Sequence, residues 1–144
     1  MQIEYKKEYS HNLGREMEFI RYGHSGKPVL VFPSQDGTCN QYEEFGMVNV
    51  LSDYIEQGRL QLFCVGSVDA ESWSDIYGDP RHRIEMQEKY FNYITNEFVP
   101  RIWDISWRND IIVTGCSMGG AHAGIVFFRR PDLFDTLISL SGMF

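Results

Sequence analysis

The residues best suited to chemistry stand at 115–119, where the chain reads Gly-Cys-Ser-Met-Gly. An apolar run at 111–113 precedes them, and a helix-compatible run follows. Glycines on both sides of Ser117 leave room for a sharp strand-to-helix turn, which a side chain at either position would obstruct. Such a turn is a nucleophile elbow, and it projects the serine hydroxyl above the edge of a sheet. The pattern therefore predicts Ser117 as a nucleophile, and the alternative is a small-residue turn with an inert serine.

Apolar runs and turn residues indicate the elements around this motif. Segments 3–10 and 16–22 predict an antiparallel start. Apolar runs at 29–32, 60–65, 111–113 and 137–140 predict strands buried on both faces. Helical spacing predicts helices over 41–57, from 80 until Pro100 interrupts, and over 118–130. Buried strands that alternate with amphipathic helices predict an α/β fold, with a mainly parallel sheet covered on both faces.

Composition narrows the class of protein. With 144 residues, 43% of them hydrophobic, the chain has the size of one globular domain, 1–144. A net charge of -7 argues against nucleic acid or an anionic membrane as partner. Three cysteines without a C-x-x-C pattern predict neither a disulfide framework nor a zinc site, and no metal or cofactor motif is present. The charged amino terminus and the lack of a long apolar run predict a cytoplasmic protein.

The order of these elements and the Gly-x-Ser-x-Gly motif resemble the α/β-hydrolase superfamily. Within it, the chain is similar to the esterase group that includes esterase D, feruloyl esterases and mycolyltransferases. The residues that carry the likeness are 29–37, 69–73, 79–86, 115–121, 131–134 and 139–142.

This resemblance implies a catalytic Ser117 that attacks a small-molecule ester and forms an acyl-enzyme. It also implies two backbone donors for the oxyanion. One is the amide of Met118, and the other comes from the loop after the first buried strand. That loop reads Pro-Ser-Gln-Asp-Gly at 33–37, where many relatives carry His-Gly-Gly. We assign Gln35, with its neighbours at 34 and 36 as alternatives.

The chain departs from the superfamily in the other two members of the catalytic triad of serine, acid and histidine. There the order is serine, then an acid, then a histidine, and the last two follow strands beyond the one predicted at 137–140. No histidine follows His122, which we interpret as a packing or surface residue, and Asp132 and Asp135 suit helix-end or surface roles. We therefore expect a domain that is incomplete at its C-terminus and nearly inactive by itself. The alternative is a naturally short relative that completes its sheet by forming a homo-oligomer.

Three functions fit these residues. The first is a serine esterase of which this chain is the N-terminal portion, and its exposed last strand would be covered by the missing C-terminal half or another subunit. The second is an acyltransferase with the same residues. The third is a non-catalytic binding or assembly module without the triad acid and histidine. The polar loop 66–78, with Asp69, Glu71, Trp73 and Asp75, either shapes a substrate pocket or serves packing.

Overall fold

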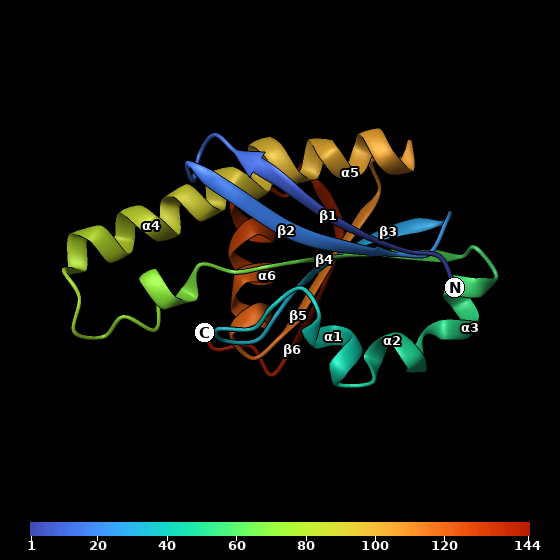
Figure 1. Ribbon diagram of the computed structural model, residues 1–144, viewed down its shortest axis with the longest axis horizontal. Coiled ribbons are helices and arrows are strands. Elements are labelled where there is room, and N and C mark those ends of the chain that lie inside the picture. The colour runs from blue at the N-terminus through green and yellow to red at the C-terminus, as the bar shows by residue number, and fades with distance from the viewer.

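One six-stranded mixed sheet organises the molecule, and the computed structural model describes all 144 residues (Figure 1). The strands lie in the order β1-β2-β4-β3-β5-β6. β1 and β2 form an antiparallel hairpin, β2 pairs antiparallel with β4, and the other pairs are parallel. The predicted antiparallel start and parallel remainder are therefore confirmed. Their bounds are β1 Ile3–Ser10, β2 Arg15–Tyr22, β3 Lys27–Phe32, β4 Leu60–Val65, β5 Ile111–Cys116 and β6 Phe134–Leu140.

Helices cover both faces of the sheet, as expected (Figure 1). One face carries three short helices, α1 Gln41–Glu44, α2 Met47–Val50 and α3 Ser52–Glu56. The other face carries α4 Pro80–Tyr93, the π-helical segment η2 Ile94–Phe98, α5 Val99–Ser106 and α6 Met118–Arg129. No helix combines the length and the apolar surface that a bilayer-spanning segment needs.

Two hydrophobic cores flank the sheet because successive strand side chains point to opposite faces. In β3, Leu30 and Phe32 pack in the core under α4, α5 and α6, whereas Val29 and Val31 pack in the core under α1, α2 and α3. A strand buried on both faces needs a continuous apolar run, which is what the sequence at 29–32 provides.

The prediction of a single helix over 41–57 is wrong. The apolar positions have helical spacing, but Gly46 adopts a left-handed conformation, with φ 83°, between α1 and α2. A left-handed glycine ends a helix without the steric cost that another residue would bear. A further break at Leu51 separates α2 from α3, and only Val48 and Ile55 of these helices are buried.

Pro100 does not end the helical arm, contrary to the prediction. The chain passes from α4 through η2 directly into α5, and Pro100 lies in the first turn of α5. Proline has no N–H to donate to the preceding turn, and its ring crowds the carbonyl four residues earlier. A wider π turn just before the proline lets the helix continue past a residue that normally breaks it.

Glu97 in η2 ties the helical arm to the turn between β1 and β2. Its carboxylate accepts hydrogen bonds from the Ser10 hydroxyl at 2.7 Å, the His11 amide at 2.9 Å, and the amide and side chain of Asn12 at 3.1 and 2.8 Å. Burial disfavours the charged form of Glu97, but these hydrogen bonds outweigh it and lower the pKa of the carboxyl.

Replacing Glu97 with glutamine should lower the free energy of unfolding by about 1–2 kcal/mol at neutral pH, because an amide cannot accept all four bonds. A lowered pKa stabilises the fold above the unfolded value of 4.5 and loses that effect as the pH falls through the native value. The difference between wild type and Glu97→Gln should therefore shrink below about pH 4.5 in urea unfolding. The exposed Glu44→Gln is the matched control and should unfold like wild type at both pH values.

Candidate active site

Ser117 occupies a strained turn between β5 and α6. Its backbone angles are φ 56° and ψ -117°, a combination that side chains other than glycine rarely adopt. The amide of Ser117 donates to the carbonyl of Leu140 at 2.8 Å, and the hydroxyl donates to the Met143 sulfur at 3.5 Å. The unusual backbone conformation predicted for a nucleophile elbow is confirmed.

The flanking glycines are required by close backbone packing. A Cβ on Gly115 would lie 2.3 Å from the backbone of Gly119. A Cβ on Gly119 would lie 2.4 Å from the carbonyl oxygen of Pro33 and 2.5 Å from that of Phe32. The elbow is thus folded against itself and against the end of β3, which brings the loop after β3 beside the first turn of α6.

Two segments supply backbone amides at this edge of the sheet. Met118 is the first residue of α6, and an amide at that position has no intrahelical acceptor. The loop after β3 forms a turn in which the amide of Gly37 donates to the carbonyl of Ser34 at 2.9 Å. Asp36 has φ 59° and Gln35 has a negative φ, the combination of a type II turn.

The amides of this turn differ in what they bind. The amide of Ser34 donates to the side-chain oxygen of Gln41 at 2.7 Å, and the amide of Asp36 donates to the carboxylate of Asp69 at 3.3 Å. Gln35 lies between them, and its amide has no acceptor within the protein. Of the three residues considered from the sequence, Gln35 is therefore the one whose N–H is free to bind a ligand.

A buried ionisable pair lies directly beneath these segments. Nε2 of His122 in α6 contacts the carboxylate of Asp69 in the 3-10 turn η1, Asp69–Glu71, at 2.8 Å. The two side chains are 2% and 1% exposed, and the rings of Phe32 and Tyr90 pack beside the imidazole. A surface role for His122 is therefore wrong. The sequence signal for this pair was one polar side chain on a helix of small and apolar residues, which needs a partner once buried.

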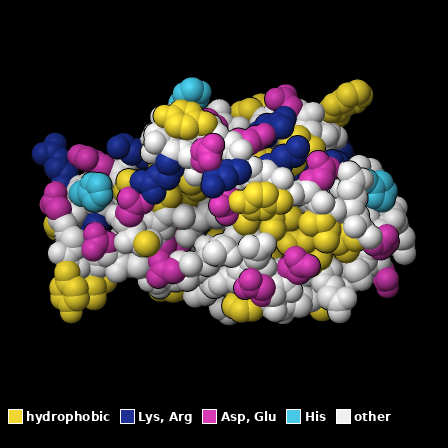
Figure 2. All heavy atoms as spheres, viewed as in Figure 1, with side chains coloured by type: hydrophobic (Ala, Val, Ile, Leu, Met, Phe, Trp, Pro, Cys, Tyr) yellow, Lys and Arg dark blue, Asp and Glu magenta, His cyan; other side chains and the backbone are white.

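Other candidates from the sequence lie away from Ser117 or are engaged elsewhere. No histidine hydrogen-bonds the Ser117 hydroxyl, since His122 faces Asp69 and the remaining three are exposed: His11, His24 and His82. Asp132 and Asp135 pair with Arg130 and Lys27 at the surface, as their predicted roles required. Basic and acidic side chains are interspersed in this way over the face seen in Figure 2.

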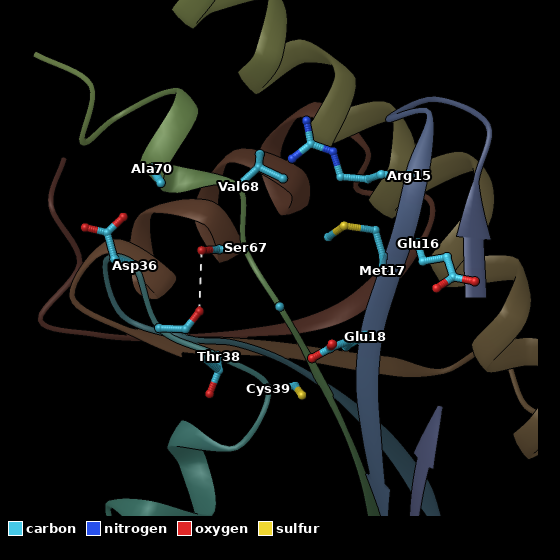
Figure 3. Close-up of a pocket in the computed structure, with 12 residues that line it drawn as sticks. Arg15, Glu16, Met17, Glu18, Asp36, Thr38, Cys39, Ser67, Val68 and Ala70 are labelled. Carbon is cyan, nitrogen blue, oxygen red and sulfur yellow. Dashed lines mark hydrogen bonds between the residues drawn. The ribbon is translucent and has the colours of Figure 1, made fainter. Parts of the chain in front are cut away.

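A pocket of about 330 Å³ opens next to the 34–37 turn, between β2, the loop after β3 and the loop after β4 (Figure 3). The Ser67 hydroxyl contacts the carbonyl of Gly37 at 3.5 Å inside it.

Arg15, which lines the pocket, pairs with Glu71 and lowers the pKa of that carboxyl. Burial raises the pKa of the Cys39 thiol, also in the lining, to about 11, so this thiol is protonated at neutral pH. Trp73 lies outside the pocket, bonded to Gln87.

A mixed sheet with helices on both faces and a strained serine after its fifth strand defines a protein of the α/β-hydrolase type. The chain belongs to the family described as Putative esterase, whose model matches residues 10–144. A search of curated proteins gave no significant match.

Solved structures of hydrolases share this fold. A ferulic acid esterase superposes with a TM-score of 0.75 at 18% identity, over 98% of this chain and 57% of its own. S-formylglutathione hydrolase from Staphylococcus aureus gives a TM-score of 0.71 at 17% identity, over 100% and 59%. Fluorophosphonate-binding serine hydrolase F from the same organism gives 0.67 at 16% identity, over 99% and 58%. The chain therefore spans less than two thirds of the length of these proteins.

Replacing Gly119 with alanine tests the close approach of the elbow to β3. Helix propensity alone would favour alanine by about 1 kcal/mol. The clash with the carbonyls of Pro33 and Phe32 should reverse this sign and lower the free energy of unfolding by about 1–3 kcal/mol. Gly66→Ala is the matched control, because its Cβ would meet only the Glu18 carbonyl at 3.7 Å. A Gly119→Ala variant as stable as wild type in urea unfolding would contradict this packing.

Proposed function

We propose that this chain supplies the nucleophile and the oxyanion hole of a serine esterase. The observation that carries the proposal is the strained backbone of Ser117, at the start of a helix that packs against the end of β3. The N–H groups of Met118 in that helix and of Gln35 in the loop after β3 have no protein acceptor. Membership in an esterase family and the likeness to serine hydrolases support it.

The proposed reaction proceeds through an acyl-enzyme. The Ser117 oxygen forms a bond to the carbonyl carbon of an ester, and its proton passes to a general base. The carbonyl oxygen becomes an oxyanion, to which the amides of Met118 and Gln35 donate. The C–O bond to the alcohol then breaks, the alcohol leaves with the proton, and water releases the acid from Ser117. If another alcohol replaces water, the same residues perform acyl transfer.

The general base has to come from residues other than the neighbours of Ser117 in this structure. The Ser117 hydroxyl contacts a methionine, and His122 is bonded to Asp69. A serine hydroxyl without a base is a poor nucleophile at neutral pH. We therefore propose that the triad acid and histidine lie outside these 144 residues, in a longer form of the protein or in a partner. The greater length of the superposed hydrolases supports this.

A fluorophosphonate probe and an activated ester such as p-nitrophenyl acetate test the nucleophile. We expect covalent labelling of Ser117, located by mass spectrometry, and no labelling of Ser117→Ala. A longer form that contributes the base should hydrolyse the ester at least about 10³-fold faster than the 144 residues alone. Activity of Ser117→Ala equal to wild type in that form would exclude Ser117 as the nucleophile. Full activity of the 144 residues as a monomer would exclude an external base.

The N–H group of Gln35 can be removed while the N–H groups of Ser34 and Asp36 are kept. Proline is favoured at the second position of a type II turn and has no N–H, so Gln35→Pro should preserve the turn and delete the donor. Gln35→Ala is matched to it, because it loses the same side chain and keeps the amide. The rate of ester hydrolysis, or of Ser117 labelling, should be about 10²–10³-fold lower in Gln35→Pro than in Gln35→Ala. Equal rates would remove Gln35 from the oxyanion hole.

A further inference from the structure

The carboxylate of Asp69 joins two elements that meet at the proposed oxyanion hole. One oxygen accepts from Nε2 of His122 on α6 at 2.8 Å, and the other accepts from the Asp36 amide at 3.3 Å. His122 is five residues after Ser117, and Asp36 follows Gln35 directly. A single buried side chain therefore connects the helix that begins at the nucleophile with the turn that carries the second donor.

The bond to the Asp36 amide acts on the least stable part of the turn. Asp36 has φ 59°, and the type II geometry that requires this value favours glycine or asparagine at that position. The amide of Asp36 belongs to the central peptide of the turn, the group that rotates when a type II turn becomes type I. An acceptor fixed under that amide selects the type II form, which Asp36 would otherwise disfavour.

Further bonds anchor the same turn to the Asp69 segment. The Ser74 hydroxyl donates to the Asp36 carboxylate at 2.7 Å, and the Gln35 side chain donates to the Ser74 hydroxyl at 2.8 Å. The amide of Ser74 in turn donates to the backbone carbonyl of Asp69 at 2.8 Å. The position of the turn above the sheet thus depends on where Asp69 is held.

His122 provides the fixed point for Asp69. It is 2% exposed, it packs against the rings of both Phe32 and Tyr90, and it lies on a helix whose first turn is held against the end of β3. Two apolar side chains would fill this space without the cost of burying a carboxylate and an imidazole. The presence of Asp69 and His122 is therefore explained better by the hydrogen bond that Asp69 makes to the 34–37 turn than by packing.

We propose that Asp69 and His122 are positioning residues, which hold the 34–37 turn so that the Gln35 amide faces the Ser117 hydroxyl. This inference rests on the proposed function for its catalytic consequence. Neither residue touches the substrate. His122 fixes the Asp69 carboxylate, the carboxylate fixes the central peptide of the turn, and the turn presents the donor.

Amide hydrogen exchange of the 144-residue chain tests the structural part without any activity. In wild type, the Asp36 amide should exchange at least about 10-fold more slowly than the Gln35 amide, because only the former is bonded. Asp69→Asn and His122→Leu should remove this protection, while amides of the central strand β3 remain protected. His122→Gln keeps an N–H donor at the position of Nε2 and should restore it. Equal exchange of Asp36 and Gln35 in wild type, or unfolding of His122→Gln, would overturn the proposal.

The reaction rate tests the functional part, in the form of the protein that labels or hydrolyses best. His122→Leu should lower kcat, or the rate constant of Ser117 labelling, by about 10–100-fold with KM changed less than about threefold, since a misplaced donor weakens transition-state binding. His122→Gln should recover most of this loss. Equal rates in all variants would overturn the positioning role and leave the esterase assignment intact. Failure of Ser117 to react in every form would instead refute the proposed function, and the exchange experiment would still decide whether the pair holds the turn.

Discussion

The close approach of α6 to the end of β3 is the constraint on which the site depends. Gly119 lies against the carbonyls of Phe32 and Pro33 with no space for a Cβ, and Gly115 lies against Gly119. This contact sets the strained backbone of Ser117 and brings the 34–37 turn beside the first turn of the helix. A larger separation would leave Ser117 and the 34–37 turn on different parts of the sheet edge. The spacing of the glycines therefore determines the distance between α6 and β3 as well as the geometry of the turn.

Local sequence patterns were sufficient to predict the sheet and the strained strand-to-helix turn at Ser117. Continuous apolar runs identified β3, β4 and β5, because strands buried on both faces carry apolar residues at successive positions. The elbow was predictable because its geometry excludes side chains at fixed offsets from Ser117. Gln35 was predicted as a donor through family resemblance. The structure adds that the amides of Ser34 and Asp36 are already hydrogen-bonded and that of Gln35 is not, which the sequence could not indicate.

The features that sequence analysis missed depend on contacts between distant residues. Asp69 and His122 are 53 positions apart, and nothing near either residue indicates the other. The break between α1 and α2 follows from a left-handed Gly46, a conformation that apolar spacing does not encode. The passage of α4 into α5 past Pro100 required a π-helical segment, η2, whose Glu97 is held by the opposite hairpin. In each case tertiary structure decided between conformations that the local sequence allowed.

The two cores differ greatly in size, and the 34–37 turn is attached to both. The core beneath α4, α5 and α6 contains 22 buried residues, and the core beneath α1, α2 and α3 contains nine. Parts of a protein with few buried contacts open at lower free energy than the rest. Ser34 is bonded to Gln41 on the small-core side, and Asp36 is bonded to Asp69 on the large-core side. When α1 opens, the turn loses its hydrogen bond to Gln41 and keeps its hydrogen bond to Asp69, so it stays attached to the rest of the fold through the larger core.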